Sequence, residues 1–172
     1  MFSDPQKNLQ QFGIGPSMKV ADFGAGSGFY TIESAKMVGA SGRVYAIDVQ
    51  KDLLDRIKSN ALTVHLNNIE IVWGDIEKIG GTKIRELLCD RVIISNVLFQ
   101  AEKKSDICLE AKRILKPGGR VLVIDWSTGV PIGPATFVSR ETTLSLFERA
   151  GLKFESEINA GDHHYGLIFK KQ

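Results

Sequence analysis

The sequence predicts an α/β fold, a three-layer sandwich in which a mostly parallel seven-stranded sheet lies between helices. Short β-rich apolar runs alternate with helical patterns along most of the 172 residues. The first run ends in the glycine-rich stretch ADFGAGSGFY, residues 21–30. The last two runs are joined by too few residues for a crossover helix, so this pair must be antiparallel.

Each element is assigned from the spacing of its apolar residues. Strands are predicted over residues 18–24, 43–48, 69–73, 90–95, 119–126, 153–158 and 164–170. Helices are predicted over residues 28–38, 51–62, 103–115 and 140–150. Lys116-Pro117-Gly118-Gly119 is a predicted turn after the third helix, because proline cannot continue helical hydrogen bonding. Ser139 and Gly151 are predicted caps of the fourth helix.

Length and composition are typical of one globular domain spanning residues 1–172. The 22 basic and 20 acidic residues are interspersed, so the sequence lacks the extended basic cluster that is typical of nucleic-acid-binding proteins. No run approaches the roughly 20 apolar residues of a membrane span, and the first residues do not resemble a signal peptide. Cys89 and Cys108 have no partner spacing and are predicted to be buried, reduced thiols. We therefore expect a cytoplasmic protein.

The glycine turn has the spacing Gly-x-Gly-x-Gly, from Gly24, Gly26 and Gly28. A strand that enters a helix through glycines lets a ligand approach the main chain closely. The dinucleotide fingerprint needs its third glycine at Phe29, and no Gly-Lys-Ser or Gly-Lys-Thr closes a phosphate loop. On spacing alone, the stretch is either a ligand-binding turn or a tight structural turn.

Two acids follow the next two predicted strands. Asp48 ends the second strand, about 20 residues after the turn, where a carboxylate can accept hydrogen bonds from both hydroxyls of a ribose. Asp75 follows the third strand and is either a ligand contact or a turn or helix-cap acid. The carboxyl ends of three strands therefore surround one predicted crevice.

At this point the sequence resembles the class I S-adenosylmethionine-dependent methyltransferases, which have a Rossmann-like fold, over nearly the whole chain. The motifs that carry the resemblance are residues 20–28, 44–48, 74–76, 90–96 and 113–120. The predicted terminal hairpin agrees with the antiparallel seventh strand of that family. The resemblance implies an enzyme that uses S-adenosylmethionine and releases S-adenosylhomocysteine.

The resemblance also implies a set of cofactor-binding residues. They are Asp22, Gly24, Ala25, Gly26, Gly28, Asp48, Val49, Gly74, Asp75, Ile76 and Asn96. In this assignment the glycine turn holds the amino-acid end of the cofactor, Asp48 the ribose, and Asp75 with the Ile76 backbone the adenine. Asp22 either supports the turn or contacts the methionine amino group, directly or through water.

Methyl transfer is an in-line displacement, so the protein mainly aligns the acceptor and excludes water, and a general base is optional. An antiparallel last strand begins where the parallel strands end, so His163 and His164 are candidate catalytic residues beside the crevice, on opposite faces. The alternative is that they are polar residues at a hairpin end. Asn96 is a third catalytic candidate, and Trp126 either walls the site or packs. No third ligand spacing suggests a metal site.

The fourth strand continues as Ser95-Asn96-Val97-Leu98-Phe99, without the Asn/Asp-Pro-Pro-Tyr/Phe sequence of many base methyltransferases, which argues against a nucleic-acid acceptor. The pattern resembles small-molecule and ubiquinone-biosynthesis-type methyltransferases, so we expect a small-molecule acceptor. Two segments could cover it, an N-terminal lid over residues 1–17 and a loop near the acceptor site over residues 127–139. The lid segment could form a short helix over the cofactor or pack on the sheet edge.

So small a lid leaves either an open site for a protein side chain or a pocket completed by the second subunit of a homodimer. Two further hypotheses on the function stay open. One is a protein that binds S-adenosylmethionine without catalysis and regulates or scaffolds a partner. The other is a nicotinamide-dependent oxidoreductase, which Phe29 and the terminal hairpin argue against.

Overall fold

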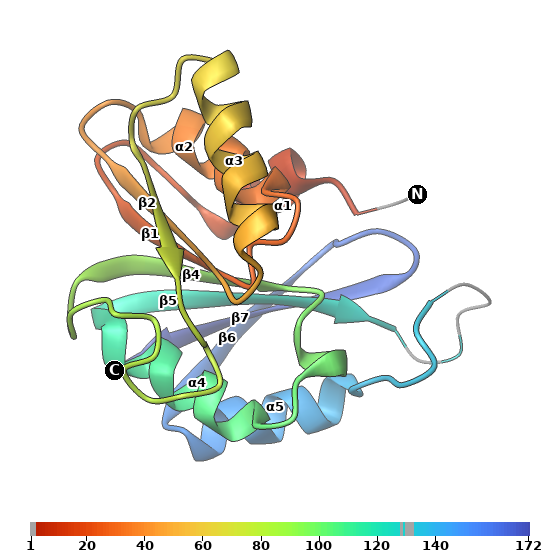
Figure 1. Cartoon of the computed structure of the whole chain (residues 1–172). Helices are drawn as coiled ribbons and strands as arrows, with labels where there is room; N and C mark the ends of the chain where they lie inside the picture. The colour runs from red at the N-terminus through yellow and green to blue at the C-terminus, as the bar shows by residue number, and fades with distance from the viewer. Residues whose placement is uncertain (1–2, 128, 130–132) are drawn as a thin grey trace.

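The computed structural model describes residues 3–127, 129 and 133–172. Its seven-stranded sheet has the order β3-β2-β1-β4-β5-β7-β6 (Figure 1). The strands are β1 (Lys19–Phe23), β2 (Arg43–Asp48), β3 (Ile69–Trp73), β4 (Cys89–Ser95), β5 (Leu115–Trp126), β6 (Leu152–Ile158) and β7 (His164–Lys171). The helices are α1 (Pro5–Phe12), α2 (Phe29–Val38), α3 (Lys51–Thr63), α4 (Lys104–Ile114), α5 (Arg140–Arg149) and the 3-10 turn η1 (Leu98–Gln100).

The sheet is mixed in the way that the short last connection predicts. Strands β3, β2, β1, β4 and β5 pair in parallel, and β7 pairs antiparallel with both β5 and β6. The α/β prediction is therefore confirmed, including its single antiparallel strand. The strand order changes direction at β1 and β4, and ligands of open α/β sheets bind beyond the carboxyl ends of strands at such a point.

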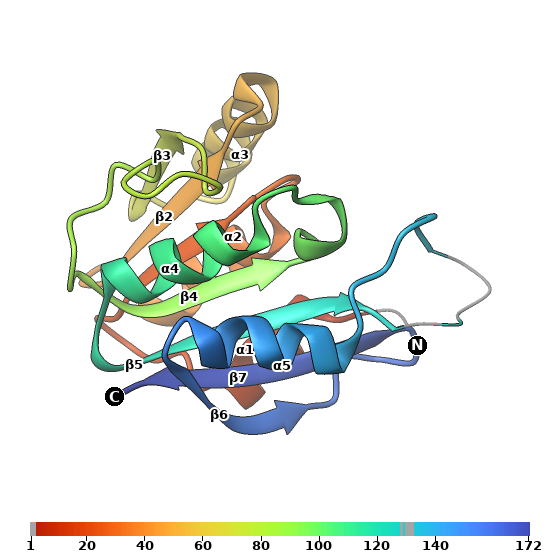
Figure 2. The same ribbon diagram turned by 90° about the horizontal axis from the view of Figure 1, so that it is seen from below.

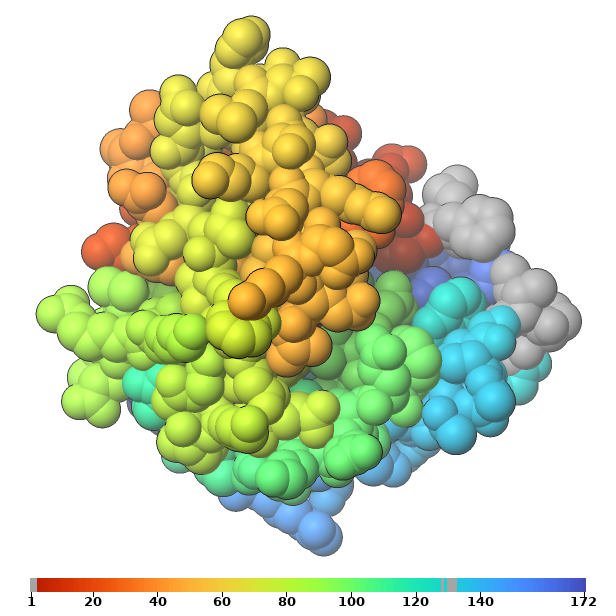
Figure 3. Space-filling model, viewed as in Figure 1, coloured from red at the N-terminus to blue at the C-terminus, as the bar shows by residue number. Residues whose placement is uncertain are grey.

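Helices cover both faces of the sheet (Figures 1 and 2). Helices α1, α2 and α3 pack on one face, where Leu9, Val38 and Ile57 are buried. Helices α4 and α5 pack on the other face, through Ile107 and Phe147. In the space-filling view, residues of the N-terminal half occupy the upper part of the visible face of the molecule, and residues of the C-terminal half occupy the lower part (Figure 3).

The predicted lid segment contains helix α1, whose apolar side chains pack with those of α2. Asp4 caps it by accepting a hydrogen bond from the Lys7 N–H at 3.3 Å, and Gly13 ends it in the left-handed conformation. Leu9 and Phe12 are fully buried in the cluster that also contains α2 side chains. The apolar face of α1 is thus part of the core.

Strand β5 begins earlier than predicted. We expected a turn over residues 116–119 and a strand from Gly119, but the strand begins at Leu115, directly after α4. Leu115 pairs with Cys89 and Arg120 with Arg91, so the four residues between them bulge within the pairing. Lys116 precedes Pro117, and a residue before proline favours the extended conformation, which explains why the chain leaves the helix directly as a strand.

A loop, rather than a helix, connects β3 to β4. Its anchor is Glu110 of α4, whose buried carboxylate accepts hydrogen bonds from the Thr82 hydroxyl at 2.5 Å and from the Gly80 N–H at 2.8 Å. Arg113 donates to the same carboxylate at 2.7 Å. These charge-assisted bonds fasten the loop to α4 and so fix the segment that follows the end of β3.

Two other predictions concern features away from the sheet edge. Cys89 and Cys108 are free and buried, as predicted, and burial raises the pKa of each thiol to about 12. None of the helices in the described part of the chain is both long enough and apolar enough to cross a membrane.

Candidate functional site

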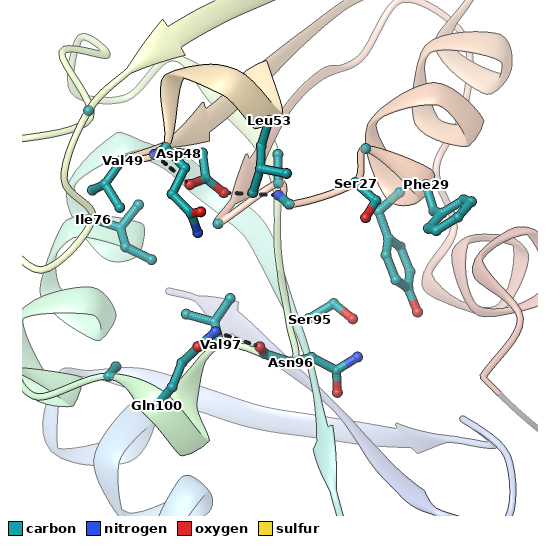
Figure 4. A pocket seen from close by; sticks show the side chains of 18 of the residues that line it. Ser27, Phe29, Asp48, Val49, Leu53, Ile76, Ser95, Asn96, Val97 and Gln100 are labelled. Carbon is teal, nitrogen blue, oxygen red and sulfur yellow. Dashed lines mark hydrogen bonds between the residues drawn. The ribbon is translucent and has the colours of Figure 1, made fainter. Parts of the chain in front are cut away.

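A cavity of about 650 Å³ lies at the carboxyl ends of β1, β2, β3 and β4. Figure 4 shows Asp48, Leu53 and Ile76 on one side of it and Asn96, Val97 and Gln100 on the other. The described lining residues are Ser3, Pro5, Gly24, Ala25, Gly26, Ser27, Gly28, Phe29, Tyr30, Asp48, Val49, Gln50, Leu53, Gly74, Asp75, Ile76, Glu77, Ser95, Asn96, Val97, Gln100 and Ala101. All the predicted cofactor-binding residues except Asp22 therefore meet in one cavity.

The three glycines of the turn all have positive φ, at 69°, 53° and 80°, but they are needed for different reasons. A Cβ at Gly24 would lie 2.7 Å from Val97 Cγ2, and one at Gly28 would lie 2.6 Å from Ile57 Cγ1. A Cβ at Gly26 would have only the Gly24 carbonyl oxygen nearby, at 3.8 Å. Gly24 and Gly28 permit close packing of the protein itself, whereas Gly26 leaves open space beside the cavity.

Four N–H groups of the turn bind within the protein. Gly24 and Ala25 both donate to the Ile47 carbonyl at 2.9 Å, and Gly28 donates to the Ala25 carbonyl at 2.8 Å. The Gly26 N–H donates to Asp48 Oδ2 at 2.9 Å. These four groups therefore do not serve as donors for a phosphate, which is how glycine turns hold dinucleotides.

Asp48 is the link between the turn and α3. Its second carboxylate oxygen accepts a hydrogen bond from the Gln50 N–H at 2.9 Å, just before α3 begins. The side chain is almost fully buried but lines the cavity. Since each carboxylate oxygen has two acceptor sites, both oxygens keep one for a ligand.

Asp75 shows the features of a turn acid as well as those of a lining residue. Its carboxylate accepts the Glu77 N–H at 2.9 Å and lies 3.1 Å from Lys78 Nζ. Partial burial acts to raise the pKa of Asp75, but these bonds outweigh it and lower the pKa. Beside it, the Ile76 side chain is an apolar part of the cavity wall.

The wall opposite Asp48 is built by the segment that follows β4. Asn96 has a φ of 57°, and its N–H donates to the Ile124 carbonyl at 2.8 Å. Asn96 Oδ1 is buried and has no hydrogen-bond partner among the described residues. Gln100 Nε2 donates to the Asn96 carbonyl at 3.3 Å (Figure 4).

Asp125, which sequence reasoning missed, supports this wall from behind. It is buried near the end of β5, and its carboxylate accepts the N–H groups of Phe99 at 3.2 Å and Trp126 at 2.8 Å. Burial raises its pKa to about 6. The available signal was a single acid at the end of the otherwise apolar run Val121-Leu122-Val123-Ile124.

Asp22 lies behind the turn and does not line the cavity. The Thr31 hydroxyl, on α2, donates to Asp22 Oδ2 at 2.6 Å. Burial raises the pKa of Asp22 to about 6, despite the opposing effect of this hydrogen bond. Of the two roles considered for Asp22, this contact supports the structural one.

Neither His163 nor His164 is among the described residues that line the cavity. The His163 carbonyl accepts the Ser127 N–H at 2.9 Å. The His164 side chain is buried, and its ring centroid lies 4.3 Å from that of Trp126. Burial lowers the pKa of His164, and neither ring nitrogen has a partner among the described residues. Trp126 therefore packs on His164 rather than lining the cavity.

The two predicted covering segments are described only in part. Residues 1 and 2 of the lid, and residues 128 and 130–132 of the loop, lie outside the described residues. Ser3 and Pro5 line the cavity, and nearby Asn8 Nδ2 donates to the Tyr30 hydroxyl at 2.8 Å. In the loop, the Thr136 hydroxyl donates to the Phe99 carbonyl at 3.3 Å.

Most lining residues that sequence reasoning missed lie within the motifs or next to them, for example Ser27 and Gln50. Their positions in the chain could have pointed to them. Ser3 and Pro5 had no local signal, since only the packing of α1 brings them to the cavity. Among the described residues, no group of three His, Cys, Asp or Glu side chains could hold a metal ion.

The strand order, the antiparallel β7 and a cavity beyond the carboxyl ends of β1 and β4 define a class I methyltransferase fold. Comparison with known proteins identifies the family. Residues 14–158 match the family described as Methyltransferase domain. This chain belongs to that methyltransferase family.

Individual relatives are similar to parts of this chain. A probable cobalt-precorrin-6B C(15)-methyltransferase (decarboxylating) from Saccharolobus solfataricus is 34% identical over 116 residues, which are 67% of this chain and 56% of that protein. A ubiquinone/menaquinone biosynthesis C-methyltransferase from Bordetella avium is 32% identical over 123 residues, 71% of this chain and 46% of that protein. The chain thus spans about half the length of these two relatives.

A solved structure matches along almost the full chain. It is a SAM dependent methyltransferase from Aquifex aeolicus, 28% identical, with a TM-score of 0.90. The match covers 99% of this chain and 91% of that one. The agreement therefore includes the sheet, both helical layers and the end of the chain.

Proposed function

We propose that the chain is an S-adenosylmethionine-dependent methyltransferase that acts on a small molecule. The observation that carries the proposal is the juxtaposition of Gly26 and Asp48 in the cavity. Gly26 leaves room for a ligand against the main chain, and Asp48 offers acceptor sites beside it. Family membership and the similarity to the Aquifex aeolicus structure support the same assignment.

The donor set and the size of the cavity fit this cofactor. A volume of about 650 Å³ is within the range of small-molecule sites. Asp48 has acceptor sites for ribose hydroxyls, and Ile76 and Val49 provide apolar surface for adenine. The turn offers no N–H from Gly24, Ala25, Gly26 or Gly28 to a phosphate, which argues against a dinucleotide.

When bound, S-adenosylmethionine supplies a methyl group made electrophilic by its sulfonium. The work of the protein is to position the acceptor in line with that methyl group and to exclude water. Asp48 and the turn hold one side of the site, and the Asn96–Gln100 segment forms the other. The Asp125 carboxylate keeps this segment in place by accepting a hydrogen bond from the Phe99 N–H, so Asp125 acts as a positioning residue.

A small-molecule acceptor is favoured by the relatives, which are named for precorrin and quinone methylation. Another relative is named an arsenite methyltransferase, but Cys89 and Cys108 are both buried in the core of this chain. Since arsenite is a thiol-seeking substrate, the position of these cysteines argues against it.

Titration calorimetry with S-adenosylhomocysteine, with NADH and ATP as controls, tests the cofactor. We expect saturable binding of S-adenosylhomocysteine only; binding of NADH instead would overturn the proposal. A methyl-labelled cofactor incubated with cell extract then tests catalysis. Label in the low-molecular-mass fraction supports the proposal, label in protein favours a side-chain acceptor, and no transfer favours a protein that binds without catalysis.

A further inference from the structure

The side chain of Glu77 joins two segments that are far apart in the chain. Glu77 is half-buried and lines the cavity next to Asp75 and Ile76. Its Oε2 atom accepts two backbone hydrogen bonds, from the Glu102 N–H at 2.8 Å and from the Lys103 N–H at 2.5 Å. A carboxylate oxygen has two acceptor sites, so both sites of this oxygen are used within the protein. The segment after β3 is thereby tied to the segment that enters α4.

The two tied segments form different walls of the cavity. Ile76 lies on the same side as Asp48, and Gln100 lies on the opposite side (Figure 4). Ala101, which follows Gln100, is buried and lines the cavity. It directly precedes the two residues whose N–H groups Glu77 binds. Glu77 therefore fixes how far apart the walls lie at the end of the cavity where the chain leaves β3.

The start of α4 is capped by Glu77 rather than by its own N-cap residue. That residue is Lys103, whose side chain makes no capping hydrogen bond to the described residues. The N–H of an N-cap residue has no partner within its helix, and the helix dipole also favours a carboxylate beside it. Glu77 supplies this carboxylate from another part of the chain. Glu110, the other anchor of the β3–β4 loop, binds residues 80 and 82 and so holds a later part of the loop.

Glu77 also orients Asp75, but through its backbone. The Glu77 N–H donates to Asp75 Oδ1 at 2.9 Å. Partial burial acts to raise the pKa of Asp75, whereas this hydrogen bond and the charges of Lys78 and Lys103 lower it. A substitution of the Glu77 side chain removes the tie to Glu102 and Lys103 and leaves this backbone bond in place. The contribution of the tie can therefore be measured separately from the orientation of Asp75.

We propose that Glu77 is a positioning residue for the adenosyl part of the cofactor. By holding the two walls together, its carboxylate sets the width of the end of the cavity that contains Asp75 and Ile76. A flat base is bound by dispersion contacts on both of its faces, and a gap of about 0.5–1 Å loses roughly a quarter to a half of such a contact. A small movement of either wall is therefore sufficient to weaken binding. This assignment deepens the proposed function and depends on it.

The test is titration calorimetry far below the unfolding temperature, with S-adenosylhomocysteine as the ligand and with adenosine measured by its displacement. Glu77→Ala should weaken the binding of both ligands by the same factor, about tenfold, because the altered contacts lie at the adenosyl end that they share. Glu77→Gln should restore the wild-type affinity, since an amide oxygen also has two acceptor sites. A general loss of stability would not produce this pattern. Glu148→Ala, the same change at an exposed position of α5, is the control and should bind as the wild type does.

The proposal is overturned if Glu77→Ala binds either ligand as tightly as the wild type does, or if Glu77→Gln loses as much affinity as Glu77→Ala. If Glu77→Ala does not fold, Glu77→Asp replaces it. Aspartate keeps the charge but is one methylene shorter, so it cannot hold both N–H groups at the wild-type spacing of the walls and should bind more weakly than Glu77→Gln. Equal affinities of these two variants would also overturn the proposal. A wild-type protein that binds S-adenosylhomocysteine while the variants show no such differences contradicts the role of Glu77 alone, whereas one that does not bind it contradicts the proposed function.

Discussion

The carboxylate of Asp48 accepts a hydrogen bond from the backbone N–H of Gly26 at 2.9 Å. The end of β2 thereby holds the turn that follows β1, and the same carboxylate also holds the start of α3 through Gln50. One side chain thus shapes the cavity and offers acceptor sites to what binds in it. Loss of this side chain should affect ligand binding more than the fold.

Asp48→Ala is expected to weaken S-adenosylhomocysteine binding by about 1.5–3 kcal/mol, or roughly ten- to a hundredfold, because a charged acceptor is lost. Calorimetry measures the dissociation constant. Asp55→Ala, an identical change on the exposed side of α3, is the control and should leave it unchanged. Equal affinities for Asp48→Ala and the wild type would remove Asp48 from the binding site.

Gly26→Ala should abolish cofactor binding at a modest cost in stability. A methyl group there enters open space beside the cavity, and the left-handed backbone costs about 1–2 kcal/mol for a residue with a Cβ. Gly13→Ala is the matched control, since Gly13 has a φ of 73° and no atom within 4 Å of an added Cβ. Both variants should lose similar stability in urea, but only Gly26→Ala should lose affinity. If both variants bind S-adenosylhomocysteine normally, the turn is structural only.

Glu110→Gln is expected to destabilise the protein by about 3 kcal/mol at pH 7, because it breaks a buried ion pair with Arg113. Burial acts to raise the pKa of Glu110, but the bonds from Arg113, Thr82 and Gly80 outweigh it and lower the pKa. The stabilisation is therefore present at neutral pH and is lost as the pH falls below the ordinary range of glutamate.

Urea unfolding at pH 7 and at pH 3 measures this effect. The control is Glu33→Gln, which breaks a more exposed pair with Lys36 and should cost about 0.5 kcal/mol or less. A Glu110→Gln variant as stable as Glu33→Gln would show that the β3–β4 loop does not depend on its anchor.

Asp22→Asn tests the raised pKa of Asp22. Burial raises the pKa of Asp22 from the ordinary 3.8 to about 6, so the folded protein holds this proton more tightly than the unfolded chain does. The resulting stabilisation of the folded state is complete below about pH 3.8 and is lost as the pH rises through 6. Asparagine does not titrate. The free energy of unfolding of Asp22→Asn relative to wild type should therefore rise between pH 4.5 and 7.5, by about 2 kcal/mol.

Asp55→Asn, the same change on the exposed side of α3, is the control. A relative stability of Asp22→Asn that falls with pH would mean that Asp22 is stabilised as the charged form, through Thr31 or through another donor.

The main strands and helices could be predicted because their patterns are local. Helix α5, for instance, has Ser139 as its N-cap, with the Thr142 N–H donating to Ser139 Oγ at 3.1 Å, as predicted. Gly151 follows the helix with a φ of 82°. The start of β5 was not predictable in the same way, because its pairing with Cys89 involves a residue 26 positions earlier.

In the candidate site, the motif residues were predictable and their supports were not. Gly26 and Asp48 belong to patterns of fixed spacing, whereas Asp125 becomes relevant only when β5 lies beside the segment after β4. The same holds for Ser3, which reaches the cavity because α1 packs on α2. Spacing along the chain contains no information on such contacts.

The sequence by itself determined the α/β class, the antiparallel last strand and the glycine turn with its acids. These features follow from apolar periodicity, loop length and the backbone freedom of glycine, all of which act over a few residues. Only the tertiary structure decided that Asp22 lies behind the cavity and that His164 packs on Trp126 outside it. Burial and side-chain direction at a strand end depend on which neighbours the sheet brings together, and those neighbours come from distant parts of the chain.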